Sequence, residues 1–140
     1  MSPMPRQKVD RNAMEVVAVK LKYGAVLRVA QEAVASKPKG YATPDTGDEY
    51  PHFINADGTP NSLVGAIFVE LGVTLPERYN TVGIRKLIRA GVIECTPKTM
   101  ELLIVLQETQ DDGLAWAQSL WFTQAAMADN ELPWNQDSEQ

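Results

Sequence analysis

The stretch Thr59–Val73, TPNSLVGAIFVELGV, decides the fold that the sequence predicts. Its large apolar residues recur at helical spacing on one stripe, while Glu70 points away from that stripe. The stripe consists of Leu63, Val64, Ile67, Phe68 and Leu71. We therefore expect one short amphipathic helix, with Ile67 and Phe68 at the centre of the core.

Both ends of this predicted helix carry recognisable signals. Thr59 is a residue type that caps a helix start, and Pro60 suits the first helical position because its missing N–H needs no partner there. Gly72 can adopt the left-handed conformation that ends a helix, and Val73 can then fold back onto the last turn. The sequence thus predicts a helix from about Thr59 to Gly72.

Composition indicates a globular protein of one domain. The 140 residues are 44 % apolar and 22 % charged, which is typical of a chain that buries a core without disulfides or a structural metal. The net charge of −5 argues against general affinity for nucleic acid, because phosphate binding needs a cationic face. A single cysteine, no apolar run of membrane-spanning length and no apolar signal core favour the cytoplasm.

The segment from Asn12 to Ala35 gives two signals. Val26, Ala30 and Val34 follow a helical stripe, but apolar and polar residues alternate over residues 17–23 as they would in a strand. A lone strand here has no evident pairing partner, so we favour one helix. Whether residues 13–23 form helix or strand stays open at this point.

The remaining chain predicts an all-α compact bundle of about five helices with one long irregular loop at residues 37–58. Further helices are expected from Asn80 or Thr81 to Ala90, from Thr96-Pro97 to about Gln110, and on to about residue 128. An aspartate of the Asp111-Asp112 pair is placed to cap the last of these helices. The domain boundaries are an N-terminal arm at 1–10, a helical domain at 11–128 and an acidic tail at 129–140.

The last predicted helix should bury one apolar side. The residues expected there are Leu114, Ala117, Leu120, Trp121 and Ala125.

Three pieces of sequence resemble a family of small uncharacterised proteins from actinobacteria and their phages. They are VLRVAQEAVASKP at residues 26–38, PNSLVGAIFVELGV at 60–73 and the Gln-x-x-Gln-Asp-x-Gly-x-x-Trp pattern at 107–116. Family members often have a cysteine where Ser62 stands in this chain. The resemblance spans residues 26–126 and implies a phage or actinobacterial origin, but it brings no catalytic residue and no substrate.

The glutamine-rich pattern is the first candidate binding site. One helical turn separates Gln107 from Gln110, so the two glutamines share a face, and Asp111 and Trp116 follow. These four residues could form a polar surface around an aromatic anchor, as binding hot spots do. They could equally be a helix cap and a core tryptophan.

Trp134 in the acidic tail is a further candidate. It lies beyond the last apolar stripe, and Pro133 makes continuation of the helix difficult. An exposed tryptophan there could fold back onto its own domain or insert into a second copy or another protein. The expected partner is therefore a host protein or a second copy of the chain, including a homodimer.

The cations on the predicted helix 81–90 support an alternative function as a sequence-specific DNA-binding regulator. Arg85, Lys86 and Arg89 lie on its wet side. The connection from Gly72 to Asn80 is longer than the turn of a helix-turn-helix, however, and a solvated helix face explains the charges as well.

No catalytic, metal or cofactor site can be assembled from the sequence. His52 is the only histidine and Cys95 the only cysteine, too few for a usual zinc site, and no Ser-His-Asp set is legible. We therefore expect no cofactor, no metal and no enzymatic activity, and favour a partner-binding protein.

Overall fold

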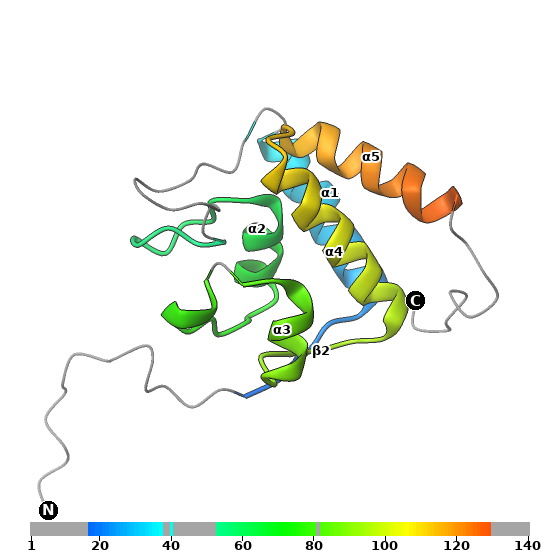
Figure 1. Cartoon of the computed structure of the whole chain (residues 1–140). Helices are drawn as coiled ribbons and strands as arrows, with labels where there is room; N and C mark the ends of the chain where they lie inside the picture. Colours follow the sequence, from blue (N-terminus) through cyan, green and yellow to red (C-terminus); the bar gives the residue numbers. More distant parts are fainter. Residues whose placement is uncertain (1–16, 38–39, 41–52, 81, 130–140) are drawn as a thin grey trace, which may run out of the picture.

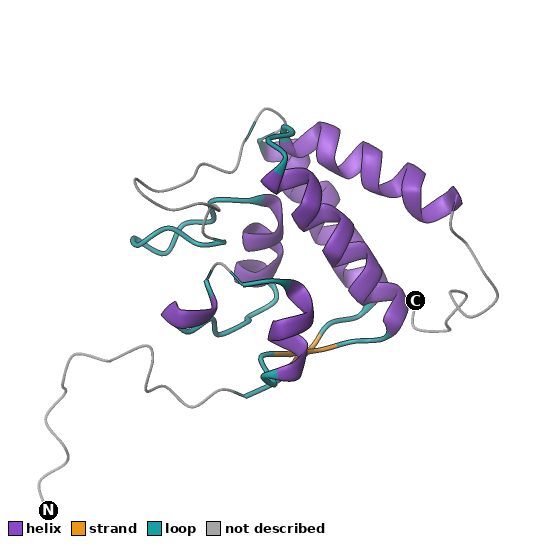
Figure 2. Cartoon of the chain, viewed as in Figure 1, coloured by secondary structure: helices purple, strands orange, loops and turns teal. Residues whose placement is uncertain are grey.

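The fold is helical, as the sequence predicts (Figure 1). The computed structural model of the chain describes residues 17–37, 40, 53–80 and 82–129, and within them there are five α-helices and one pair of two-residue strands (Figure 2). In chain order the elements are β1 (Val19–Lys20), α1 (Tyr23–Ser36), α2 (Leu63–Glu70), the 3-10 helix η2 (Glu77–Tyr79), α3 (Ile84–Arg89), β2 (Ile93–Glu94), α4 (Pro97–Asp111) and α5 (Trp116–Asp129).

The short strand pair corrects our preference for a helix through residues 13–23. β1 pairs in parallel with β2, with Val19 opposite Ile93, and the Leu21 N–H donates to the Glu94 carbonyl at 2.8 Å. The alternation over residues 17–23 was thus a true strand signal. Its partner lies more than 70 residues away in the sequence, which is why no local pattern revealed the pairing.

The parallel pairing of β1 with β2 sets the relative direction of the helices that follow them, α1 and α4. β1 leads into α1 and β2 leads into α4, each after a short connection. Because the strands run the same way, α1 and α4 lie side by side and run in the same direction (Figure 1). α5 then returns along this pair, and α2 packs against α1 and α4.

Helix α2 is the centre of the core. Every residue from Leu63 to Phe68 is buried, and Ile67 and Phe68 are fully enclosed, which confirms their expected place. The Phe68 ring meets Phe53 edge to face, with 5.3 Å between ring centroids. The helix is therefore enclosed on all sides over its first six residues, whereas the sequence predicted an amphipathic helix with one buried face.

The start of α2 differs from the prediction by one turn. Ser62 is the cap, and its Oγ accepts a hydrogen bond of 2.9 Å from the Gly65 N–H. Thr59 instead donates from its backbone N–H to the Asp57 carboxylate at 3.0 Å, within a turn. Pro60 forms an isolated antiparallel bridge with Ile54, so it does not start the helix.

The end of α2 is as the sequence predicts. Gly72 has a φ of +79°, and the Val73 N–H reaches back to the Phe68 carbonyl at 2.9 Å. Helix α3 ends in the same way, at Gly91, where the Val92 N–H donates to the Leu87 carbonyl at 2.9 Å. Two consecutive helices thus terminate through the same backbone motif.

The sequence predicts the starts of the helices less accurately than their ends. Thr96 caps α4 and Pro97 is its first residue, as expected. α3 begins only at Ile84, after Gly83, and is shorter than the predicted helix 81–90. No aspartate caps α5: Asp111 is the last residue of α4, and the Ala115 N–H is bonded by Gln118 Oε1 at 3.2 Å.

Candidate binding surface

The predicted site residue Gln110 lies inside the molecule and caps a different helix. Its side chain is 3 % exposed. Its Oε1 accepts a hydrogen bond of 2.9 Å from the Leu63 N–H, and its Nε2 donates to the Leu114 carbonyl at 3.3 Å. Leu63 is the first residue of α2, so its N–H has no acceptor within that helix. Gln110 supplies the missing acceptor.

Gln107 repeats this arrangement one turn earlier. Its Oε1 accepts from the Ile84 N–H at 3.3 Å, and its Nε2 donates to the Val82 carbonyl at 3.2 Å. Ile84 is the first residue of α3. Helix α4 therefore caps the starts of two neighbouring helices with two glutamines from one face, and both amides are engaged with the backbone.

Trp116 is also a core residue. Its side chain is 3 % exposed, its backbone N–H donates to the Gly40 carbonyl at 2.8 Å, and the Lys37 Nζ lies 5.3 Å from its ring centroid. Its Nε1 has no hydrogen-bond partner among the described residues. Gln110 and Trp116 are thus interior groups, so the polar surface around an aromatic anchor is not formed by this set.

Asp111 is the exposed member of the predicted set, and its acidity is altered. Partial desolvation raises the pKa of this carboxyl to about 6, and the negative charges of Asp112 and Glu108 act in the same direction. Asp111 therefore holds a proton at a pH where an ordinary aspartate is ionised. Trp134, the fifth predicted residue, lies outside the described residues.

The exposed aromatic residues of the described chain lie instead on the outer side of α5. Trp121 is 71 % exposed and Phe122 is 50 % exposed. Of the five residues expected to line the buried side of this helix, only Leu120 is buried. The predicted apolar stripe is therefore wrong: Trp121 and Ala125 are exposed, and Leu114 and Ala117 are half-buried.

The inner side of α5 explains this rotation. It is formed by Trp116, Ser119, Leu120, Thr123 and Met127, a mixture of apolar groups and hydroxyls. The Ser119 hydroxyl pairs with the Thr109 hydroxyl of α4, a polar contact within the packed seam. A periodicity of apolar residues alone could not reveal a buried side that contains hydroxyl groups.

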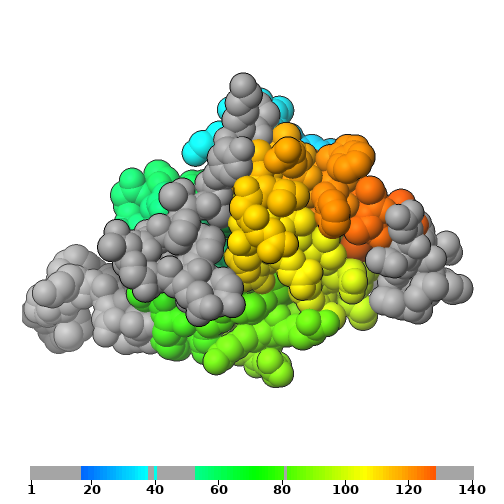
Figure 3. All heavy atoms as spheres, turned by 45° about the horizontal axis from the view of Figure 1, so that its top comes forward, coloured from blue at the N-terminus to red at the C-terminus, as the bar shows by residue number. Residues whose placement is uncertain are grey.

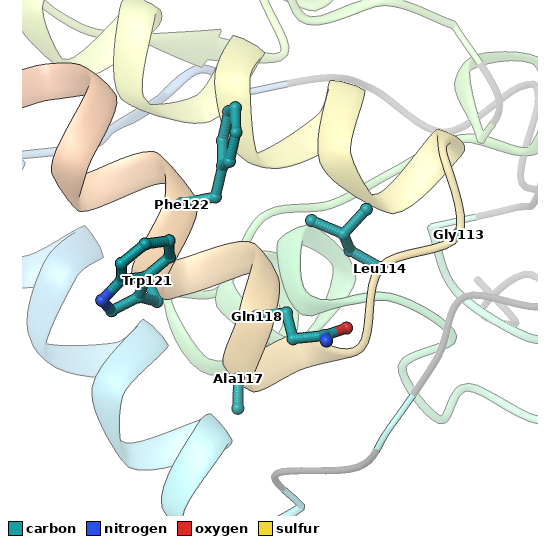
Figure 4. A pocket seen from close by; sticks show the side chains of 6 residues that line it. All are labelled: Gly113, Leu114, Ala117, Gln118, Trp121 and Phe122. Atoms are coloured by element: carbon teal, nitrogen blue, oxygen red, sulfur yellow. The ribbon is translucent and has the colours of Figure 1, made fainter.

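A pocket of about 540 Å³ opens on this outer side of α5. We call it the α5 pocket, and its lining residues are Gly113, Leu114, Ala117, Gln118, Trp121 and Phe122. Figure 4 shows the Phe122 ring reaching toward α4 and the Trp121 ring on the other side, with Leu114 and Gln118 nearer the start of the helix. α5 itself lies along one edge of the molecule beside α4 (Figure 3).

The sequence contains a signal for this surface that periodicity does not use. No residue from Leu114 to Ala128 is charged, although most solvated helices carry charges on their outer side. A stretch of 15 residues without charge that exposes two aromatic rings has the composition of the centre of a protein interface. The lack of charged residues over 114–128 is therefore the sequence feature that could have revealed this surface.

The cations proposed for DNA contact lie on a different element. Arg85, Lys86 and Arg89 are exposed on α3 and form no ion pair with another described residue. α3 is only six residues long, and the segment from Leu71 to Gly83 that separates it from α2 contains η2. The described residues therefore do not form the tight turn of a helix-turn-helix.

Other classes of site find no direct support. Among the described residues, no three His, Cys, Asp or Glu side chains gather as metal ligands would, and His52 lies outside them. None of the described helices has both the length and the apolar character needed to cross a membrane. Cys95 is half-buried and forms no disulfide.

Comparison with known proteins adds no relative. No family model, curated protein or solved structure matches this chain. The fold and the surface together describe a small helical domain whose edge helix α5 exposes two aromatic rings and carries no charge before Asp129.

Proposed function

We propose that this chain is a non-enzymatic protein-binding domain whose contact surface is the outer side of α5. The observation that supports this function is the exposure of Trp121 and Phe122 on a helix without charged residues from Leu114 to Ala128. Aromatic residues are enriched among binding hot spots, and charged residues are depleted at interface centres. Leaving both rings in water costs free energy that a partner would recover.

The size of this surface favours a transient complex. Full burial of an aromatic side chain covers roughly 150–250 Å², and Trp121 and Phe122 are already partly covered, at 71 % and 50 % exposure. The two rings therefore supply less than half of the roughly 800 Å² per partner that a stable complex buries. We accordingly propose a weak partner that inserts a bulky apolar side chain into the α5 pocket. The proposed setting is the cytoplasm of an actinobacterium, with the protein encoded by the host or by its phage.

DNA binding through α3 is the second candidate function. Arg85, Lys86 and Arg89 favour it, because they are exposed and form no ion pair within the described part of the chain. The chain's net charge of −5 and the short α3 favour the protein partner instead.

A comparison of surface variants tests both functions. Tagged wild-type protein, Trp121→Ser, Val69→Ser and a triple alanine variant of Arg85, Lys86 and Arg89 would be used to capture proteins from actinobacterial lysate. Val69 is an exposed apolar residue of α2 and serves as the matched control. We expect a captured protein that is lost with Trp121→Ser and retained with both other variants.

The same proteins would be tested for DNA binding at low salt. Binding by the wild type whose salt dependence flattens in the triple variant would favour the regulator. If Trp121→Ser captures the same protein as the wild type, the outer side of α5 is not the contact surface.

A further inference from the structure

We infer that the C-terminal tail of the same chain inserts Trp134 into the α5 pocket and so competes with the proposed partner. The inference rests on the proposed function for the competition, whereas the docking of the tail itself needs no partner. Three observations carry it: the size and lining of the pocket, the distance to Trp134 along the chain, and the small area that the pocket offers.

The pocket suits an indole ring. Its volume of about 540 Å³ falls within the range of roughly 300–1,000 Å³ that small ligands occupy in proteins. Trp121, Phe122 and Leu114 provide apolar walls. The exposed Gln118 Oε1, which accepts from the Ala115 N–H, has a second lone pair that can accept from an indole N–H. Aromatic rings that meet at an angle stabilise each other beyond their buried area.

The chain length after α5 matches the distance to be covered. Gln118 precedes Asp129 by 11 residues, which is about 16 Å along the helix axis at 1.5 Å per residue. Trp134 follows Asp129 by five residues, which reach about 16–18 Å when extended. Phe122 is closer, so the tail spans the required distance with its tryptophan at the pocket.

The local sequence favours such an extended return. Pro133 cannot continue a helix with a normal backbone hydrogen bond, and it disfavours the helical conformation at Leu132. Leu132 adds a second apolar side chain next to Trp134. The segment Leu132-Pro133-Trp134 therefore combines a stop to the helix with the bulky group that the pocket fits.

The small area of the pocket favours a tethered occupant over a free second copy. Two aromatic rings bury too little for a stable dimer at low concentration. A tail attached to the end of α5 is held at an effective concentration of about millimolar, so the same contact suffices within one chain. Docking of the tail in its own chain is thus the arrangement that the geometry supports.

The test uses the full chain and three forms of it: wild type, Trp134→Ala and the matched tail control Gln136→Ala. NMR would follow the Trp121 indole N–H and the Gln118 side-chain amide at several protein concentrations, with light scattering for mass. We expect Trp134→Ala to shift both signals and Gln136→Ala to leave them unchanged. The chemical shifts of the wild type should not change with protein concentration, and light scattering should give the mass of a monomer.

Adding a peptide of residues 130–140 to Trp134→Ala completes the test. The peptide should restore the wild-type positions at about millimolar concentration, as expected for an untethered tail. Signals indifferent to Trp134→Ala would overturn the inference. Wild-type shifts that grow with concentration and mass would also overturn it, in favour of a tail exchanged between copies.

These results are distinct from failure of the proposed function. Capture of a partner that depends on Trp121 but is unaffected by Trp134→Ala would keep the function and reject the competing tail. Docking of Trp134 without any partner that depends on Trp121 would keep the tail and reject the function. When both hold, Trp134→Ala should increase partner capture several-fold.

Discussion

The start of α2 and the inner side of α5 are both buried, yet their polar groups are treated differently. At α2 the backbone N–H groups of Leu63 and Gly65 are bonded by Gln110 and Ser62. At α5, within the described residues, Trp116 Nε1 and Thr123 Oγ1 are buried without a hydrogen-bond partner.

The apolar groups of the two helices differ in the opposite sense. α2 buries its large side chains up to Phe68, whereas α5 leaves Trp121 and Phe122 in water. The enclosure of α2 up to Phe68 and the bonded N–H groups at its start make it the stable centre, and we expect local opening to cost less at α5. Such an edge element is where a binding surface can be kept without weakening the core.

The largest expected effect in the comparison of α2 with α5 comes from removing the Phe68 ring at the centre of α2. Phe68→Ala should lower the free energy of unfolding by about 3–5 kcal/mol, because the transfer energy of the ring is lost and a cavity remains. Urea melts measure the change. A loss below about 1 kcal/mol would show that α2 is not the centre of the core.

A second test concerns the close approach of backbone at α2. A Cβ added at Gly65 would lie 1.9 Å from the Phe53 carbonyl oxygen. Gly65→Ala should therefore cost about 1–3 kcal/mol or more through overpacking. Gly83→Ala, where a Cβ meets nothing within 4 Å, is the control and should cost under about 1 kcal/mol, the difference between glycine and alanine as a cap.

The capping glutamines give a graded test. Gln110→Ala leaves the Leu63 N–H buried without its acceptor and should cost about 1–3 kcal/mol. Gln107→Ala should cost less, since water can replace this partly buried amide, and the exposed Glu108→Ala should change stability by under about 0.5 kcal/mol. Equal losses for the three variants in urea melts would contradict the capping role.

At α5 the sign of the expected effect reverses. Thr123→Val removes a buried hydroxyl that has no partner among the described residues, so it should raise stability by about 1 kcal/mol. Ser119→Ala breaks the contact with the Thr109 hydroxyl and should lower stability by about 1 kcal/mol. If thermal melts show that both variants destabilise, the inner side of α5 is as well satisfied as α2.

The smallest effect is a pH dependence at the junction of α4 with α5. Because the folded-state pKa of Asp111 is about 6 against an ordinary 3.8, the folded chain binds more protons between these values than the unfolded chain does. The contribution of Asp111 to stability is therefore greater near pH 4 and falls as pH rises through 6. Asp111→Asn should be more stable than wild type at pH 7, and the difference should shrink at pH 4.5; a constant difference in urea melts would contradict the raised pKa.

The sequence by itself determined the class of fold, the core position of Ile67 and Phe68, and the helix ends that depend on nearby residues. Thr96-Pro97 starts a helix, and Gly72 and Gly91 each end one, because the hydrogen bonds of these caps join residues three to five positions apart. Such contacts can be read from a short window of sequence.

Only the tertiary structure decided the pairing of β1 with β2, the role of the glutamines and the orientation of α5. Gln110 bonds a backbone N–H 47 residues away, and nothing near Leu63 indicates that an acceptor will arrive from α4. Likewise, both sides of α5 contain apolar groups. The side that is buried is the one on which the Ser119 hydroxyl contacts the Thr109 hydroxyl of α4. Trp121 is exposed because partners distant in sequence, and not helical periodicity, set the rotation of this helix.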